Sequence, residues 1–125
     1  MIHIDTHIAI WLFNAERKRL TTAAMDVLAH EQMGYSPMVR HELDLLYERE
    51  RLPAPSPDAI LRYLSAAFNA AESQIGFNRV IDEATSLRWT RDPFDRLIVA
   101  NAIVDGARLV TADERILEHF QDAVW

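Results

Sequence analysis

RDPFDRLIVANAIVDGARLVTAD, residues 91–113, contains a complete helix and a complete strand with acids at their boundaries. Asp92 followed by Pro93 is typical of a helix start, in which the aspartate is the N-cap and the proline is the first helical residue. Gly106 suits the end of the same helix. Leu109 to Thr111 are then predicted to form a strand, and Asp113 follows it. This segment therefore predicts a helix and a strand whose junctions carry carboxylates.

Similar signals on both sides of this segment predict strands that alternate with helices. Strands are expected at residues 2–4, 34–35, 74–77, 109–111 and 123–125. Helices are expected at about residues 8–13, 22–32, 37–52, 58–71, 78–87, 93–104 and 113–120. Because parallel strands need connections longer than a hairpin, these helices indicate a parallel sheet. We therefore expect an α/β protein of three layers, with a short central parallel sheet between helices.

The length of 125 residues corresponds to one domain, and we expect a single domain over residues 1–125. The proline-rich stretch at 53–58 is expected to be a loop, because the roughly fifty residues before it are too few to fold alone. The chain has no cysteine, no signal-peptide pattern and no apolar run long enough to span a membrane. We therefore expect a cytoplasmic protein with no membrane segment.

The net charge of −6 argues at first sight against a nucleic-acid partner. If four of the 19 acids bind a metal, 15 acids remain against 13 Lys and Arg, and the bound cation reverses the local charge. The net charge therefore does not exclude an RNA substrate.

Asp5 and Asp113 each follow a predicted strand and precede a predicted helix. Each of them suits the N-cap of its helix, which is the alternative to a functional role. Functional sites in open α/β sheets form beyond the carboxyl ends of the strands, and both acids lie there. If their strands are neighbours, the two carboxylates meet at one edge of the sheet.

Glu42 and Asp95 are expected inside helices, on apolar faces. The residues three and four positions from Glu42 are all apolar: Met38, Val39, Leu45 and Leu46. Asp95 shares its face with Ile98, Val99 and Ala102. A buried carboxylate must be paired, protonated or bound to a cation. The alternatives are an ion pair with an arginine for Glu42 and a helix-dipole contact for Asp95.

A cluster of carboxylates without cysteine or histidine spacing for zinc suits a hard cation such as Mg²⁺ or Mn²⁺. Such a cation activates water and neutralises phosphate charge in an in-line displacement, which is the chemistry of nucleases. With only three glycines, the chain has no glycine-rich phosphate loop and no nucleophile elbow. The residues therefore favour metal-dependent phosphodiester hydrolysis over nucleotide-driven chemistry.

Four segments in order resemble a PIN-domain ribonuclease of the VapC toxin type. They are Ile4-Asp5-Thr6-His7, Ser36-Pro37 leading to Glu42, Asp92-Pro93-Phe94-Asp95-Arg96 before LIVANA, and Thr111-Ala112-Asp113-Glu114-Arg115. The resemblance spans nearly the whole chain, although residues 53–89 match nothing diagnostic of the family.

The resemblance implies a PIN-like fold and a metal site. Its acidic quartet would be Asp5, Glu42, Asp95 and Asp113, which would hold Mg²⁺ or Mn²⁺ and carry catalysis. Thr6 and Thr111 would be polar supports. Asp95 rather than Asp92 matches the family position, and Asp92 stays a second candidate. Family membership further implies an RNA substrate, a homodimer and a cognate antitoxin.

Two other functions fit part of the sequence. A phosphoacceptor or phosphatase domain would use Asp5 as nucleophile, but the Asp-x-Asp pattern is absent and Lys18 is badly placed to bind a phosphoryl group. A catalytically inactive PIN-like binding module would lack one of the acids, and none is missing.

Overall fold

Five strands form one sheet at the centre of the molecule, and the computed structural model describes all 125 residues. The strands are β1 (Ile2–Ile4), β2 (Met33–Tyr35), β3 (Ala71–Glu72), β4 (Arg108–Val110) and β5 (Ala123–Val124). Their order across the sheet is β3-β2-β1-β4-β5, and every neighbouring pair is parallel. The predicted parallel sheet is therefore present, with the first strand in its middle.

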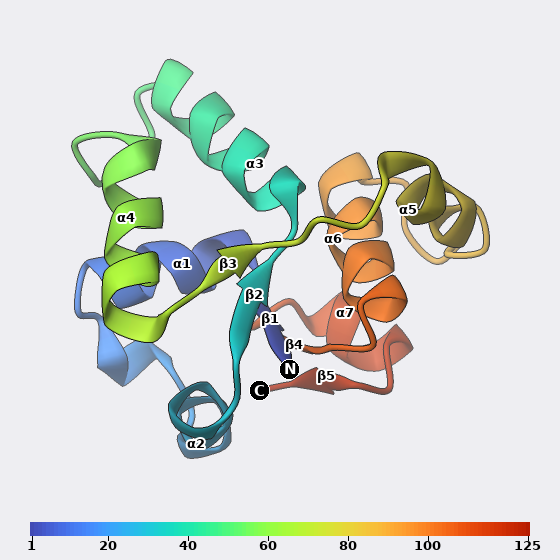
Figure 1. The fold of residues 1–125 in the computed structure, drawn as a ribbon, viewed down its shortest axis with the longest axis horizontal. Coiled ribbons are helices and arrows are strands. Elements are labelled where there is room, and N and C mark those ends of the chain that lie inside the picture. Colours follow the sequence, from blue (N-terminus) through green and yellow to red (C-terminus); the bar gives the residue numbers. More distant parts are fainter.

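Seven helices connect these strands. They are α1 (Thr6–Phe13), α2 (Thr22–His30), α3 (Pro37–Glu48), α4 (Pro57–Phe68), α5 (Phe77–Ala84), α6 (Pro93–Val104) and α7 (Glu114–His119), with a 3₁₀ turn at Arg17–Arg19. Figure 1 shows α1, α3 and α4 on one side of the strands and α5, α6 and α7 on the other. The three-layer α/β/α prediction is confirmed. No helix is long and apolar enough to cross a membrane.

The core lies between the sheet and these two helix layers. β1 is buried on both faces, because Ile2 and Ile4 lie on one face and His3 lies on the other, and all three are buried. Ile8 of α1, Ile98 of α6 and Leu109 of β4 are buried in the same cluster. Burial of both faces is typical of the central strands of a parallel sheet, and Leu109 and Val110 of β4 are likewise fully buried.

Several element boundaries differ from the sequence-based expectations, and three of them have a clear structural reason. Helices α3 and α4 end at Glu48 and Phe68, earlier than residues 52 and 71, because Glu50 and Asn69 adopt left-handed backbone conformations with φ of 56° and 52°. The strand expected at 74–77 was wrong. The chain pairs with β2 only at Ala71–Glu72, and the apolar side chains that suggested a strand lead directly into α5.

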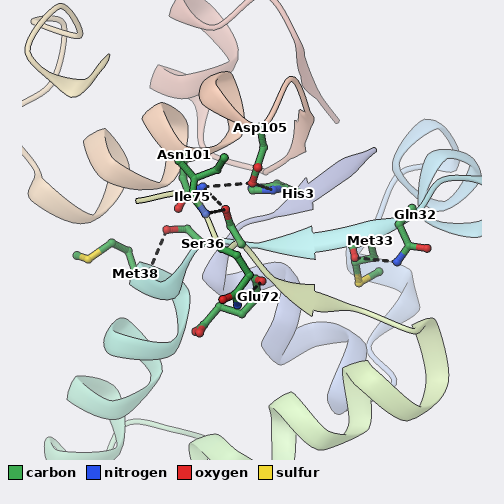
Figure 2. Close-up of polar contacts among 11 residues, drawn as sticks. His3, Gln32, Met33, Ser36, Met38, Glu72, Ile75, Asn101 and Asp105 are labelled. Carbon is green, nitrogen blue, oxygen red and sulfur yellow. Dashed lines mark hydrogen bonds and ion pairs between the residues drawn. The ribbon is translucent and has the colours of Figure 1, made fainter. Parts of the chain in front are cut away.

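A network of polar side chains, which the sequence did not reveal, links the sheet to α6 (Figure 2). His3 in β1 is 1% exposed, and its Nε2 lies 2.9 Å from Oδ2 of Asp105, the residue that ends α6. The Asn101 side-chain amide donates to Ser73 Oγ at 2.8 Å and to Asp105 at 3.3 Å. Burial lowers the pKa of His3, although Asp105 opposes the shift. This network holds α6 against β1 and against the segment that follows β3.

Candidate functional site

Asp5 and Asp113 meet at the carboxyl edge of the sheet because β1 and β4 are neighbours. Asp5 Oδ1 accepts a hydrogen bond from the Thr6 amide at 2.7 Å. Thr111 Oγ1 donates to Asp5 Oδ2 at 2.7 Å and accepts from the Asp113 amide at 3.0 Å. The Thr111 hydroxyl thus joins the ends of the two strands. It also fixes the Asp5 carboxylate, which is only 8% exposed.

Glu42 extends from α3 toward this edge. Its carboxylate is half-buried and forms no ion pair, so the alternative of a structural pair with an arginine is not present. Burial raises the pKa of Glu42, and the nearby charge of Asp5 adds to the shift. The Thr6 hydroxyl lies near Glu42 and opposes this rise, but it is buried without a hydrogen bond of standard geometry. Thr6 therefore holds a polar atom in place beside Glu42.

Asp92 and Asp95 have different positions at the start of α6. Asp92 Oδ1 caps the helix by accepting from the amides of Phe94 at 2.8 Å and Asp95 at 3.2 Å. Asp95 lies within the first turn and is partly buried. Burial, followed by repulsion from the other acids, raises the pKa of Asp95 to about 7. Asp92 makes the largest of these repulsive contributions, so it too borders the site.

All the predicted site residues gather at one edge of the sheet. Asp5, Glu42, Asp92 and Asp113 each raise the pKa of Asp95, which means that five carboxylates share one electrostatic environment. They come from the ends of β1 and β4 and from α3 and α6. None of them pairs with an arginine or lysine. The cluster therefore gathers acidic side chains that have no arginine or lysine partner.

The donor chemistry of this cluster fits a divalent cation, although its side chains do not close around one point. No three of its groups stand close enough to hold a single ion. Desolvation and repulsion raise the pKa values of Asp5, Glu42 and Asp95, and a bound dication would relieve the repulsion. The predicted ligands Asp5, Glu42, Asp95 and Asp113 fit such an ion by the chemistry of their carboxylates.

The N-cap alternative also holds for three of the acids. Asp5, Asp92 and Asp113 each accept at least one amide hydrogen bond at a helix start. For Asp92 and Asp113 only Oδ1 is used, and Oδ2 accepts no hydrogen bond from the protein. A cap and a ligand are therefore compatible roles for the same carboxylate.

Two rings that sequence reasoning did not single out border the acids. His41 precedes Glu42 on α3 and Phe94 precedes Asp95 on α6, and their ring centroids lie 5.7 Å apart. His41 also lines a groove of about 660 Å³ between the starts of α3 and α4 and the segment from Ile75 to Val80. None of the five acids lines this groove, so it lies beside the carboxylate cluster rather than at it. Their place next to the acidic motif residues was the only sequence signal for these rings.

Comparison with known proteins places the chain in a family. The model of the PIN domain matches residues 2–121. Ribonuclease VapC22 of Mycobacterium tuberculosis (strain ATCC 25618 / H37Rv) is 34% identical over 119 residues, which cover 93% of this chain and 89% of that protein.

Two solved structures share the fold. A toxin-antitoxin complex from Klebsiella pneumoniae matches with a TM-score of 0.70 and 18% identity, covering all of this chain and 97% of the other. VapBC2 from Rickettsia felis, bound to a DNA fragment from its promoter, matches with a TM-score of 0.64 and 17% identity over 99% and 96% of the two chains. With a family model that covers almost its full length and a relative at 34% identity, the chain belongs to the PIN domain family.

Proposed function

We propose that this protein is a metal-dependent endoribonuclease and the toxin of a toxin-antitoxin pair. The observation that carries the proposal is the cluster of carboxylates without a neutralising cation, built by four separate segments of a PIN-domain chain. The similarity to a protein named as a ribonuclease supports an RNA substrate.

Asp5, Glu42, Asp95 and Asp113 are proposed to hold Mg²⁺ or Mn²⁺, which when bound supplies an activated water and charge neutralisation at the phosphate. Thr111 orients the Asp5 carboxylate by its hydrogen bond. The buried start of α1 limits the access of bulk water to Asp5. The Asp5 carboxylate is thus held in one orientation before substrate arrives.

The decisive experiment is cleavage of single-stranded RNA with and without divalent ions. We expect cleavage with Mg²⁺ or Mn²⁺ and none in excess EDTA. Glu42→Gln should abolish most of the activity, whereas Glu48→Gln, an exposed acid on the same helix, should leave it unchanged. Millimolar Mn²⁺ should also raise the melting temperature of the wild type, because a ligand that binds only the folded state stabilises it. Undiminished cleavage in EDTA would refute metal dependence.

The protein partners are also proposals. One solved neighbour with this fold is a toxin-antitoxin complex, which supports a cognate antitoxin. We propose that this antitoxin covers the site. We further propose a homodimer that acts in the cytoplasm. Co-purification of the chain with the product of a neighbouring gene, and loss of RNA cleavage in that complex, would test the antitoxin.

The phosphoacceptor alternative is disfavoured by the sequence around Asp5, because the Asp-x-Asp pattern is absent there and Lys18 is badly placed to bind a phosphoryl group.

A further inference from the structure

We propose that His41 and Phe94 form a stacking platform for one RNA base next to the cleaved bond. The proposal rests on the proposed function, because it assigns a substrate contact to the same site. It concerns binding of the base, whereas the carboxylates act on the phosphate.

The two rings lie where the two acid-bearing helices approach each other. His41 belongs to α3 and Phe94 to the first turn of α6, and their planes are tilted by 33° at a centroid distance of 5.7 Å. Glu42 and Asp95 are the next residues on the same helices. A base that packs on these rings would therefore keep its phosphate near the carboxylates.

His41 has no other partner in the protein. Its imidazole is exposed and takes part in no side-chain hydrogen bond or ion pair. Phe94 is partly buried, so one part of its ring anchors in the core while the rest stays accessible. The imidazole also borders the groove of about 660 Å³, which offers space for the strand beyond the stacked base.

Because the site is acidic, a contact with a base can add binding affinity that contacts with the phosphates cannot supply without a cation. Phosphates are repelled by the acids until a cation is bound, and no arginine or lysine pairs with those acids. Stacking of a base on an aromatic ring is independent of the phosphate charge and tolerates every base. Bases of single-stranded RNA are free to stack in this way, whereas those of a duplex are not.

The test measures the affinity and cleavage of short single-stranded RNAs in which one nucleotide at a time is abasic. His41→Ala and Phe94→Leu should each weaken binding of the intact RNA by about tenfold. His41→Tyr, which keeps an aromatic ring but loses the imidazole, should retain most of the affinity. His30→Ala removes an exposed imidazole from α2, and we expect no change in binding.

The abasic RNAs separate stacking from a structural role. At one abasic position next to the cleaved bond, wild type and His41→Ala should bind equally, because the stacked base is already missing. An unchanged affinity of His41→Ala for intact RNA, or an equal loss at every abasic position, would overturn the platform. Binding without cleavage by the wild type would refute only the proposed nuclease function, and absence of RNA binding would refute both.

Discussion

At the scale of single residues, Asp92 and Asp95 have different structural roles although they are only three positions apart. Asp92 uses one oxygen to cap α6, and Asp95 lies inside the first turn with a pKa near 7. The difference arises from the backbone, because only a residue before the first turn can accept from the free amides of the helix start. Substitution of each residue should therefore produce a different defect.

Asp92→Ala should lose about 1 kcal/mol of unfolding free energy, because two amides of α6 lose their acceptor. We expect substantial metal-dependent RNA cleavage to remain. Thermal melting and cleavage of the same preparation measure both effects. An inactive Asp92→Ala beside an active Asp95→Ala would show that the metal is assigned to the wrong residue.

Asp95→Asn should stabilise the metal-free protein at pH 8 and have little effect near pH 4. The folded pKa of about 7 lies above the ordinary value of 3.8, so the folded state binds the extra proton between these pH values. Wild-type stability therefore decreases as the pH rises through this range, and the variant lacks this decrease. We expect a gain on the order of 1–2 kcal/mol at pH 8, since the side chain is only partly buried. Thermal melting of wild type and Asp95→Asn in EDTA from pH 4 to 8 measures this gain in stability. A gain that is constant across this range would contradict the raised pKa of Asp95.

At the scale of helices and strands, the sequence predicted most of the elements and the place of the acids. Helix starts were visible because Ser36-Pro37 and Asp92-Pro93 combine a cap with a first-turn proline. The sequence did not predict that β1 and β4 are neighbours in the sheet. Strand order depends on how distant elements pack, and the sequence of one strand does not encode this. The edge strand β3 was misplaced because two paired residues leave almost no pattern.

The sequence indicated which residues belong to the candidate site, but it did not indicate which side chains contact one another. Apolar neighbours along the chain indicated that Glu42 faces inward, and the structure has it half-buried. The hydrogen bond from Thr111 to Asp5 and the approach of His41 to Phe94 depend on how distant elements meet. No spacing rule within one helix or strand reports such contacts.

An ion pair between elements makes a further prediction. Glu31, at the end of α2, accepts a hydrogen bond from Arg108 of β4, and this bond lowers the pKa of Glu31 below its usual 4.5. The pair therefore stabilises the fold above pH 4.5, and this contribution is lost as the pH falls through the lowered value. Glu31→Gln should cost about 0.5–1 kcal/mol at pH 7, because Arg108 is partly exposed.

Thermal melting of Glu31→Gln and wild type from pH 7 to pH 3 tests this pair, with Glu48→Gln as the control for an exposed, unpaired acid. The difference between wild type and Glu31→Gln should shrink below about pH 4. A difference that grows on acidification would mean that Arg108 does not stabilise the charged form of Glu31.

At the scale of the whole molecule, the proposed homodimer has a testable surface. Phe77 and Ile81 lie four residues apart on α5 and are 65% and 39% exposed, which makes them apolar neighbours on the surface. Replacing both with serine should weaken self-association at least tenfold if this face is the interface. Light scattering over a range of concentrations measures it. Tyr47→Ser, at another exposed ring, serves as the control, and a monomeric wild type would refute the dimer.

β1 is made well before β4, although the two strands pair side by side in the sheet. Thr111 follows Asp5 by 106 residues, and the hydrogen bond between them joins the two strand ends at the carboxylate cluster. A growing polypeptide therefore cannot complete this edge of the sheet until Thr111 and Asp113 have been made. In the proposed nuclease, a nascent chain that ends before β4 would lack the complete carboxylate cluster and could not cut RNA.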